Sequence, residues 1–273
     1  MTTTSTLTPD EVRSYTEHGT LFPLRAMSTE AAAGYRAKLE ELEREHPETA
    51  STILRSKSHL ALAWVAEIAR LDPIVDAVSS IIGPDVYCWG SSFFIKNPHH
   101  PGFVAWHQDA PFSAIPPGAE LLTAWVALAP STVANGCLKV VPGTHTKQAE
   151  HVFTDNESNM LSQGQKIAVD VDEADAAIIE LAPGEFSLHH QFIFHGSGPS
   201  QSDESRIGVA FRYMRPFQSE TGDKVPATHI RGEDRYGCFE EEPRPRYDLE
   251  PSAVAYLDEQ LRARHGDRYR TSK

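Results

Sequence analysis

The sequence has few cysteines, an excess of acidic over basic residues and no long apolar run. Its three cysteines, Cys88, Cys137 and Cys238, are odd in number, far apart and outside any C-x-x-C pattern, which argues against a disulfide framework or a thiolate zinc site. The net charge of −13 argues against nucleic acid as a partner, because neutralising phosphates requires a basic face. No stretch reaches the length of a membrane span, and the N-terminus does not resemble a secretory signal. These absences predict a cytoplasmic protein that binds neither membranes nor nucleic acid.

Hydrophobic patterns divide the 273 residues into three parts, which we predict to form a single domain over 1–273. Residues 1–85 form a helical preface, 86–215 a β-core of about eight short strands, and 216–273 a C-terminal extension. The core predicts a mainly β fold of closed or double-sheet type with flanking helices. The helices are expected at about 9–18, 28–46, 61–70, 72–83 and 252–264.

His107 and Asp109 form an H-x-D pair in the predicted strand 103–109. Side chains two apart on a strand point to the same face, so the imidazole and the carboxylate are expected to lie together. They are two parts of the 2-His-1-carboxylate triad that holds non-haem Fe(II). His195 ends the apolar segment 186–195 and precedes a turn, which makes it the candidate for the third ligand.

His189 and His190 lie in the same segment, 186–195. Neighbouring residues of a strand face opposite ways, so at most one of them faces a metal bound by His195. We interpret both as packing residues or as outer support for the ligands.

Arg206 follows His195 by eleven positions (206 − 195), in the next predicted strand. Burying an arginine in a β-core costs free energy unless a carboxylate forms hydrogen bonds with its planar guanidinium group. Ser197 lies two residues beyond His195 and can add a hydroxyl to the same anion. The alternation of this strand also places Gly208, Ala210 and Arg212 on the face of Arg206, which leaves room for a ligand.

Several motifs occur together in order, and with them the segment from about residue 86 to 215 resembles the phytanoyl-CoA dioxygenase family. Proteins of this family are Fe(II)- and 2-oxoglutarate-dependent oxygenases on a double-stranded β-helix, a jelly-roll or cupin-like core. The motifs are H-x-D at 107 and 109, Trp125 in TAWVAL, Asn135-Gly136-Cys137, Pro142-Gly143-Thr144-His145, His195-Gly-Ser197 and Arg206.

The resemblance implies a role for seven residues and a requirement for Fe(II), 2-oxoglutarate and O2. These residues are His107, Asp109 and His195 for iron, and Arg206, Ser197, Trp125 and Ser92 for 2-oxoglutarate. Lys96, near Ser92, either binds an anionic group or lies at the end of its strand with the ammonium reaching into solvent.

The carboxylate of Asp109 bears on the reaction class. Related halogenases replace it with a small residue so that chloride can bind, so hydroxylation is favoured over halogenation. The composition, rich in Ala and Arg, suggests a bacterial source, and the expected substrate is a small molecule of specialised metabolism. Two alternatives remain: a cupin-like isomerase or hydrolase that uses the same triad without 2-oxoglutarate, and a metal-free binding protein. The sequence leaves open the substrate and whether it is free or tethered to a carrier, the oligomeric state, and the role of the loop 143–165. It also leaves open whether the oxidation is a hydroxylation, a desaturation, a cyclisation or an epoxidation.

Overall fold

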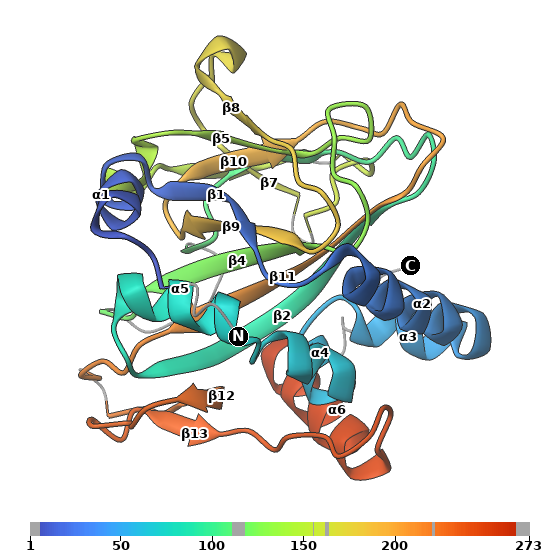
Figure 1. Cartoon of the computed structure of the whole chain (residues 1–273), viewed down its shortest axis with the longest axis vertical. Coiled ribbons are helices and arrows are strands. Elements are labelled where there is room, and N and C mark those ends of the chain that lie inside the picture. Colours follow the sequence, from blue (N-terminus) through green and yellow to red (C-terminus); the bar gives the residue numbers. More distant parts are fainter. Residues whose placement is uncertain (1–5, 111–117, 155, 162–163, 220–221, 266–273) are drawn as a thin grey trace.

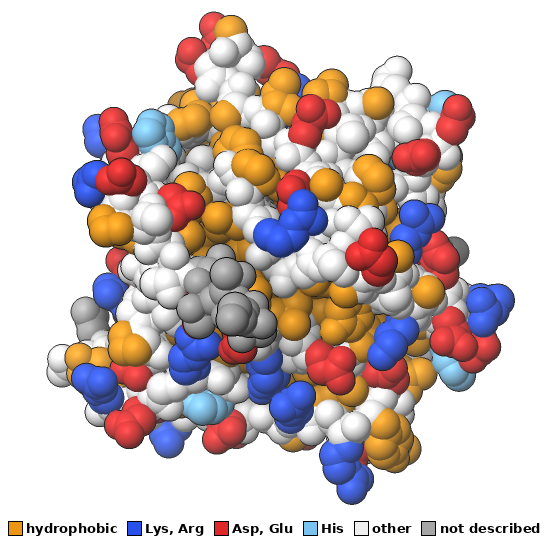
Figure 2. All heavy atoms as spheres, in the orientation of Figure 1, with side chains coloured by type: hydrophobic (Ala, Val, Ile, Leu, Met, Phe, Trp, Pro, Cys, Tyr) orange, Lys and Arg blue, Asp and Glu red, His pale blue; other side chains and the backbone are white. Residues whose placement is uncertain are grey.

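Two facing β-sheets form the centre of the molecule, and helices cover the outer side of the larger sheet (Figure 1). The computed structural model describes residues 6–110, 118–154, 156–161, 164–219 and 222–265, with the backbone alone for 264 and 265. The face seen in Figure 2 carries acidic and basic side chains interspersed with apolar ones. None of the described helices is long and apolar enough to cross a membrane.

The predicted helices are present, with one more that the sequence did not suggest. Helix α1 begins with a capping box between Thr8 and Glu11 and ends at Gly19 in the left-handed conformation. Pro47 begins the additional helix, α3, directly after α2. The helices are α1 (Pro9–His18), α2 (Thr29–Glu45), α3 (Pro47–Ile53), the 3-10 turn η1 (Ser58–Leu60), α4 (Ala63–Ile68), α5 (Asp72–Ile82) and α6 (Pro251–His265).

The larger sheet has seven strands in the order β1-β9-β4-β11-β2-β12-β13. Its central strands are antiparallel, and their outward-facing apolar side chains, such as those of Leu122, Phe186 and Phe211, share one core with the helices. The strands are β1 (Thr20–Arg25), β9 (Glu185–His190), β4 (Leu121–Ala127), β11 (Arg206–Met214), β2 (Val86–Lys96), β12 (Val225–Arg231) and β13 (Phe239–Glu241).

The smaller sheet has four strands in the order β3-β10-β5-β8, and a separate hairpin joins β6 to β7. These strands are β3 (Val104–His107), β10 (Phe194–Ser197), β5 (Leu138–Val141), β8 (Ala177–Ile179), β6 (His151–Phe153) and β7 (Gln165–Ile167). Residues of both sheets, including Trp125 and Ala210 of the larger and Val140 of the smaller, pack together between them. This arrangement confirms the predicted double-sheet core with flanking helices.

Two details of the predicted strands are wrong. The segment 186–195 is not one strand, because β9 ends at His190 in the larger sheet and β10 begins at Phe194 in the smaller one. The strand β3 ends at His107, so Asp109 lies just beyond it, in a bend. The first difference places His189 and His195 on facing sheets.

The C-terminal extension is tied to the helical preface by a buried polar network. The Lys57 ammonium donates to Oε1 of Glu242, and Thr228 Oγ1 donates to Oε2 of the same carboxylate over 3.1 Å. His59 Nε2 lies 3.7 Å from Glu242 Oε2. All four residues are buried, so this network fixes the extension against the first third of the chain.

Candidate metal centre and cosubstrate site

The structure brings the three predicted ligands together. His107 of β3 and His195 of β10 are direct antiparallel partners. Their Nε2 atoms lie 3.7 and 3.8 Å from Oδ1 of Asp109, and the three candidate ligand atoms lie within 4.8 Å of one another. Two imidazole nitrogens and one carboxylate oxygen that converge in this way fit the donor set of a non-haem Fe(II).

The second nitrogen of each histidine is fixed by the backbone. Nδ1 of His107 donates to the carbonyl of Ala105 over 2.9 Å, and Nδ1 of His195 donates to the carbonyl of Ile193 over 3.0 Å. With hydrogen on Nδ1, each ring presents the Nε2 lone pair to the centre of the site. Burial lowers the pKa of His195 well below its usual value, so its ring is neutral, as a metal ligand must be.

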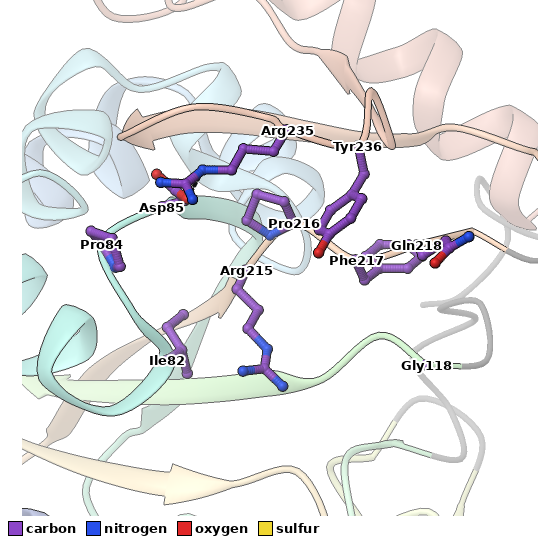
Figure 3. Close-up of a pocket in the computed structure, with 10 residues that line it drawn as sticks. All are labelled: Ile82, Pro84, Asp85, Gly118, Arg215, Pro216, Phe217, Gln218, Arg235 and Tyr236. Carbon is purple, nitrogen blue, oxygen red and sulfur yellow. Dashed lines mark ion pairs between the residues drawn. The ribbon is translucent and has the colours of Figure 1, made fainter.

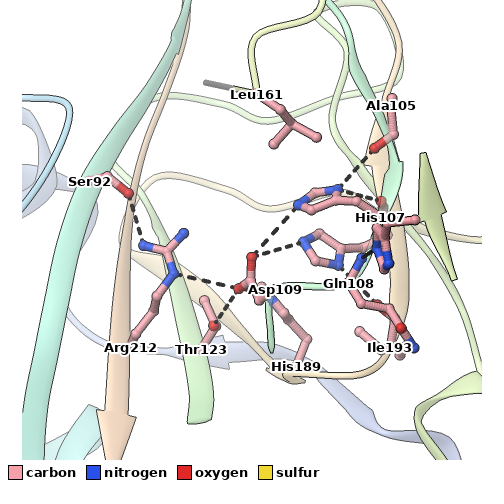
Figure 4. A network of polar contacts seen from close by, with 12 residues as sticks. Ser92, Ala105, His107, Gln108, Asp109, Thr123, Leu161, His189, Ile193 and Arg212 are labelled. Atoms are coloured by element: carbon pink, nitrogen blue, oxygen red, sulfur yellow. Dashed lines mark hydrogen bonds and ion pairs between the residues drawn. The ribbon is translucent and has the colours of Figure 1, made fainter. Parts of the chain in front are cut away.

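The second oxygen of Asp109 faces the larger sheet (Figure 4). Oδ2 accepts a hydrogen bond from Thr123 Oγ1 at 3.1 Å and lies 3.6 Å from Arg212 Nε and 4.0 Å from His189 Nε2. Burial raises the pKa of Asp109, but Arg212 and the two ligand histidines outweigh it and hold the pKa well below the usual range. Asp109 is therefore ionised, with Oδ1 turned to the histidines and Oδ2 held by the other sheet.

Arg206 and Lys96 lie side by side in the interior, as direct partners on β11 and β2. The Lys96 ammonium donates to Ser197 Oγ over 2.7 Å, and the Arg206 guanidinium lies 5.6 Å from the centre of the Trp125 ring. Lys96 is 0% exposed and Arg206 2% exposed. The structure thus brings together three of the residues that the resemblance assigned to 2-oxoglutarate, with Lys96 added.

These two cations have no counter-charge in the part of the chain that the structure describes. Nε of Arg206 is buried without a hydrogen-bond partner there. Burial and the charge of Arg206 lower the pKa of Lys96 to about 7, and burial lowers that of Arg206 to about 10. Two desolvated cations side by side create a site for an anion.

Ser92, the fourth residue assigned to 2-oxoglutarate, lies elsewhere on β2. Its hydroxyl accepts a hydrogen bond from Nη1 of Arg212 over 3.0 Å. The role of Ser92 in binding the cosubstrate stays a prediction.

The sequence did not single out Arg212 and His189 as residues of the site. Their signals were present: strand alternation puts Arg212 on the face of Arg206, and a break after His190 would have freed His189 from the strand of His195. His190 lies outside the metal site, with its ring 5.3 Å from that of His145. Outer support of the ligands, one of the two roles considered for these histidines, agrees with the position of His189.

Gln108 connects the metal centre to the loop 143–165. Its side-chain amide donates to the carbonyls of Lys147, over 2.8 Å, and Phe192, and its carbonyl accepts from the Ala149 amide over 2.8 Å. The loop contains strand β6, and Figure 4 shows its Leu161 turned toward the metal centre.

A separate cavity of about 460 Å³ opens on the surface, away from these residues (Figure 3). Asp85 and Arg235 form an ion pair of 3.2 Å in it, and Tyr236 is 61% exposed. None of the metal-site residues lines it. The lining residues are Ile82, Pro84, Asp85, Gly118, Arg215, Pro216, Phe217, Gln218, Arg235 and Tyr236.

Comparisons with known proteins point to one family. Residues 5–208 match the family model of phytanoyl-CoA dioxygenase. A probable phytanoyl-CoA dioxygenase of Caenorhabditis elegans is 28% identical over 202 residues, which cover 69% of this chain and 62% of that protein. Phytanoyl-CoA dioxygenase domain-containing protein 1 of Bos taurus is 31% identical over 127 residues, or 45% of this chain and 43% of that protein. These matches therefore span less than two thirds of the curated relatives.

Solved structures match over more of the chain. The non-heme monooxygenase ThoJ, in its apo form, aligns with a TM-score of 0.81 and 29% identity over 97% of this chain and 100% of its own. CytC3 with Fe(II) and alpha-ketoglutarate aligns with a TM-score of 0.65 and 24% identity over 90% of this chain and 96% of its own, and so shares the fold. Because the family model covers most of the sequence and the His-Asp-His triad is in place, the chain belongs to the phytanoyl-CoA dioxygenase family of Fe(II)/2-oxoglutarate-dependent oxygenases.

Proposed function

We propose that the protein is a hydroxylase that uses Fe(II), 2-oxoglutarate and O2 to oxidise a C–H bond of a small molecule in bacterial specialised metabolism. The observation that carries the proposal is a buried pair of cations, Lys96 and Arg206, without a described counter-charge, in the interior that also holds the triad. A cupin-like isomerase or hydrolase needs the triad but has no use for this pair.

Each group of residues has a distinct task in this proposal. His107, Asp109 and His195 hold the iron, and their fixed outer contacts keep Nε2 and Oδ1 directed at it. When bound, iron and 2-oxoglutarate supply oxidative decarboxylation to succinate and CO2, with transfer of one oxygen atom to the substrate.

The anion clamp, defined here as Lys96, Ser197 and Arg206, holds the distal carboxylate of 2-oxoglutarate. Two cations and a hydroxyl match the charge and the acceptors of a carboxylate. The Trp125 ring packs beside the guanidinium and would line the same site. Gly208 leaves room for it, since a Cβ there would lie 1.9 Å from the ring.

Asp109 favours hydroxylation over halogenation. Its Oδ1 faces both histidines and would occupy the coordination position that a halide needs. A carboxylate at this position therefore supports oxygen transfer as the outcome.

The proposal is tested by reconstitution with Fe(II) without oxygen, followed by measurement of 2-oxoglutarate binding and of succinate formed after oxygen is admitted. We expect His107→Ala to lose bound iron and succinate formation, and Arg206→Gln to retain iron while its affinity for 2-oxoglutarate falls at least ~30-fold, about 2 kcal/mol for a charged hydrogen-bonded partner.

Arg215→Gln is the matched control, because Arg215 forms an exposed ion pair with Glu120 at 3.0 Å. It should bind 2-oxoglutarate as the wild type does. Unchanged 2-oxoglutarate binding in Arg206→Gln would favour the cupin-like alternative, and absence of bound metal in the wild type would favour a binding protein.

A further inference from the structure

Three polar side chains form a row across the inner face of the larger sheet. His189 of β9 is the direct partner of Thr123 on β4, and Thr123 is the direct partner of Arg212 on β11. Directly opposed residues of neighbouring strands point to the same face. Since Thr123 bonds Asp109, the whole row faces the metal centre.

Arg212 has donors that the protein does not use. Nη1 bonds Ser92, Nε faces Asp109 at 3.6 Å, and Nη2 has no hydrogen bond to any described residue. Figure 4 shows this nitrogen turned into the space between the two sheets. The side chain is 16% exposed, so a ligand in that space can reach it. A guanidinium with a free edge is suited to a carboxylate.

The inner face of β2 beside Arg212 is open above one residue, Gly90. The next residue in the row is Gly90 of β2, directly opposite Arg212, and a Cβ placed there would meet no described atom within 4 Å. At the other end of the row, Nδ1 of His189 is buried without a described partner. The row thus combines an unused cation, an unused polar atom and free volume.

The charges of the interior favour an anion at this position. The side chains that the structure places around the site are cationic at Lys96, Arg206 and Arg212 and anionic only at Asp109. A bound divalent ion adds two positive charges. It also partly neutralises the Asp109 carboxylate, so less negative charge remains to balance the Arg212 guanidinium. 2-Oxoglutarate removes two of these charges and leaves an excess.

This position is distinct from the anion clamp. Arg206 and Arg212 are six residues apart on β11, about 20 Å along an extended strand. The clamp contains Ser197, beyond His195 on β10, whereas Arg212 lies beside Asp109. Two separate anion sites therefore adjoin one metal centre.

We propose that Arg212, supported by Ser92 and His189, binds a carboxylate group of the substrate in the space over Gly90. The inference rests on the proposed function, because it names the substrate class of that site. Held by the planar fork, the carboxylate would fix the orientation of the substrate relative to the metal, and the rest of the molecule would extend from Gly90.

The test uses full-length protein loaded with Co(II), a redox-inert replacement that reports on its surroundings by visible absorption. 2-Oxoglutarate is added first, and then straight-chain monocarboxylates from acetate to octanoate or their primary amides. We expect the best acid of the series to bind at least ~10-fold more tightly than its amide, the ~1.4 kcal/mol of a charged hydrogen bond. Arg212→Gln should abolish this preference, and Arg212→Lys should retain part of it.

Matched variants separate this subsite from its surroundings. Gly90→Val fills the free space, so it should weaken acid binding while 2-oxoglutarate binding stays within ~3-fold of wild type. Arg215→Gln should change neither.

Equal binding of acids and amides to the wild type would overturn the inference. So would an Arg212→Gln variant that loses 2-oxoglutarate affinity as strongly as acid affinity, since Arg212 would then serve the cosubstrate. Failure of the wild type to bind 2-oxoglutarate at the first step would overturn the proposed function as well, and is seen before any acid is added.

Discussion

At the scale of single residues, Lys96 stands out because it is fully buried beside a second cation, Arg206. Its only described hydrogen bonds run to neutral oxygens, those of Ser197, Gly136 and Gly198. Burying two adjacent positive charges lowers the free energy of unfolding as long as no anion is bound between them. In the proposed anion clamp, Lys96 therefore increases the affinity for 2-oxoglutarate but lowers the stability of the free protein.

Lys96→Met tests this opposition. With a pKa of about 7 in the fold, against 10.5 ordinarily, Lys96 binds fewer protons folded than unfolded, so its penalty is largest below pH 7 and fades as pH rises from 7 to 10.5. At pH 6 we expect the variant to have a higher melting temperature and a free energy of unfolding that is larger by about 1–4 kcal/mol. We also expect it to bind 2-oxoglutarate more weakly. A variant that is less stable at pH 6 would refute the assigned penalty.

The same pKa predicts a pH dependence of cosubstrate binding. Above pH 7 the lysine of the free protein is increasingly neutral, and it must take up a proton to meet a carboxylate. The affinity of metal-loaded protein for 2-oxoglutarate should therefore fall by up to ~10-fold per pH unit above about 7. Calorimetry in buffers of different ionisation enthalpy measures the proton uptake, which Lys96→Met should lack.

Thr123 orients the carboxylate of Asp109, the candidate metal ligand, because its hydroxyl donates to Oδ2. Thr123→Val keeps the shape and removes this bond, so metal affinity should fall about 10–100-fold, the usual effect of losing an outer contact. Ser58→Ala, which removes a buried hydroxyl bonded to the Ile53 carbonyl in the helical preface, is the control and should leave metal affinity unchanged. Competition with a chelator measures both.

At the scale of elements, strand alternation predicted which candidate site residues lie close together, because most of them lie on regular strands. It placed Arg206 and Arg212 on one inner face, and the H-x-D spacing brought His107 and Asp109 together even though β3 ends between them. Alternation could not locate the turn between β9 and β10, since residues 191–193 (Gln-Phe-Ile) carry no Gly, Pro, Asn or Asp. That turn is fixed by tertiary contacts.

One such contact is the Gln108 side chain, which bonds the Phe192 carbonyl in that turn and the backbone at 147 and 149. Gln108→Leu should leave these groups unpaired and destabilise the protein by about 2–3 kcal/mol. Hydrogen exchange should show faster exchange in 147–153 and 190–194. Unchanged exchange in both segments would show that the loop is held by other contacts.

At the scale of the whole molecule, the C-terminal extension completes the larger sheet. The family model ends at residue 208, yet β12 pairs with β2, and the polar network at Glu242 joins this part to the helical preface. Glu242→Ala leaves the Lys57 ammonium buried and unpaired, so we expect a loss of about 3–5 kcal/mol in unfolding free energy. The exposed neighbour Glu241→Ala should change it little.

The pH dependence of this network has a defined sign. Burial raises the pKa of Glu242, but the nearby His59 ring and the charge of Lys57 outweigh it and lower the pKa below 4.5. The stabilisation is thus present above about pH 4.5 and is lost as pH falls through the folded value. Thermal unfolding of wild type and Glu242→Ala should therefore converge in acid, and a constant difference down to pH 2 would contradict this.

The two oxygens of Asp109 face different sheets, and this has a consequence for how the protein can change over evolution. The candidate metal ligands come from the smaller sheet and from the bend that follows β3. The residues of the proposed substrate subsite, Arg212, Ser92 and Gly90, belong to the larger sheet. Substitutions on the inner face of β2 can therefore reshape the proposed substrate site while the three candidate metal ligands stay in place. Thr123, Arg212 and His189 reach Oδ2 from the larger sheet, so substitutions at other positions of that face can alter the proposed substrate preference while these contacts of Asp109 are kept.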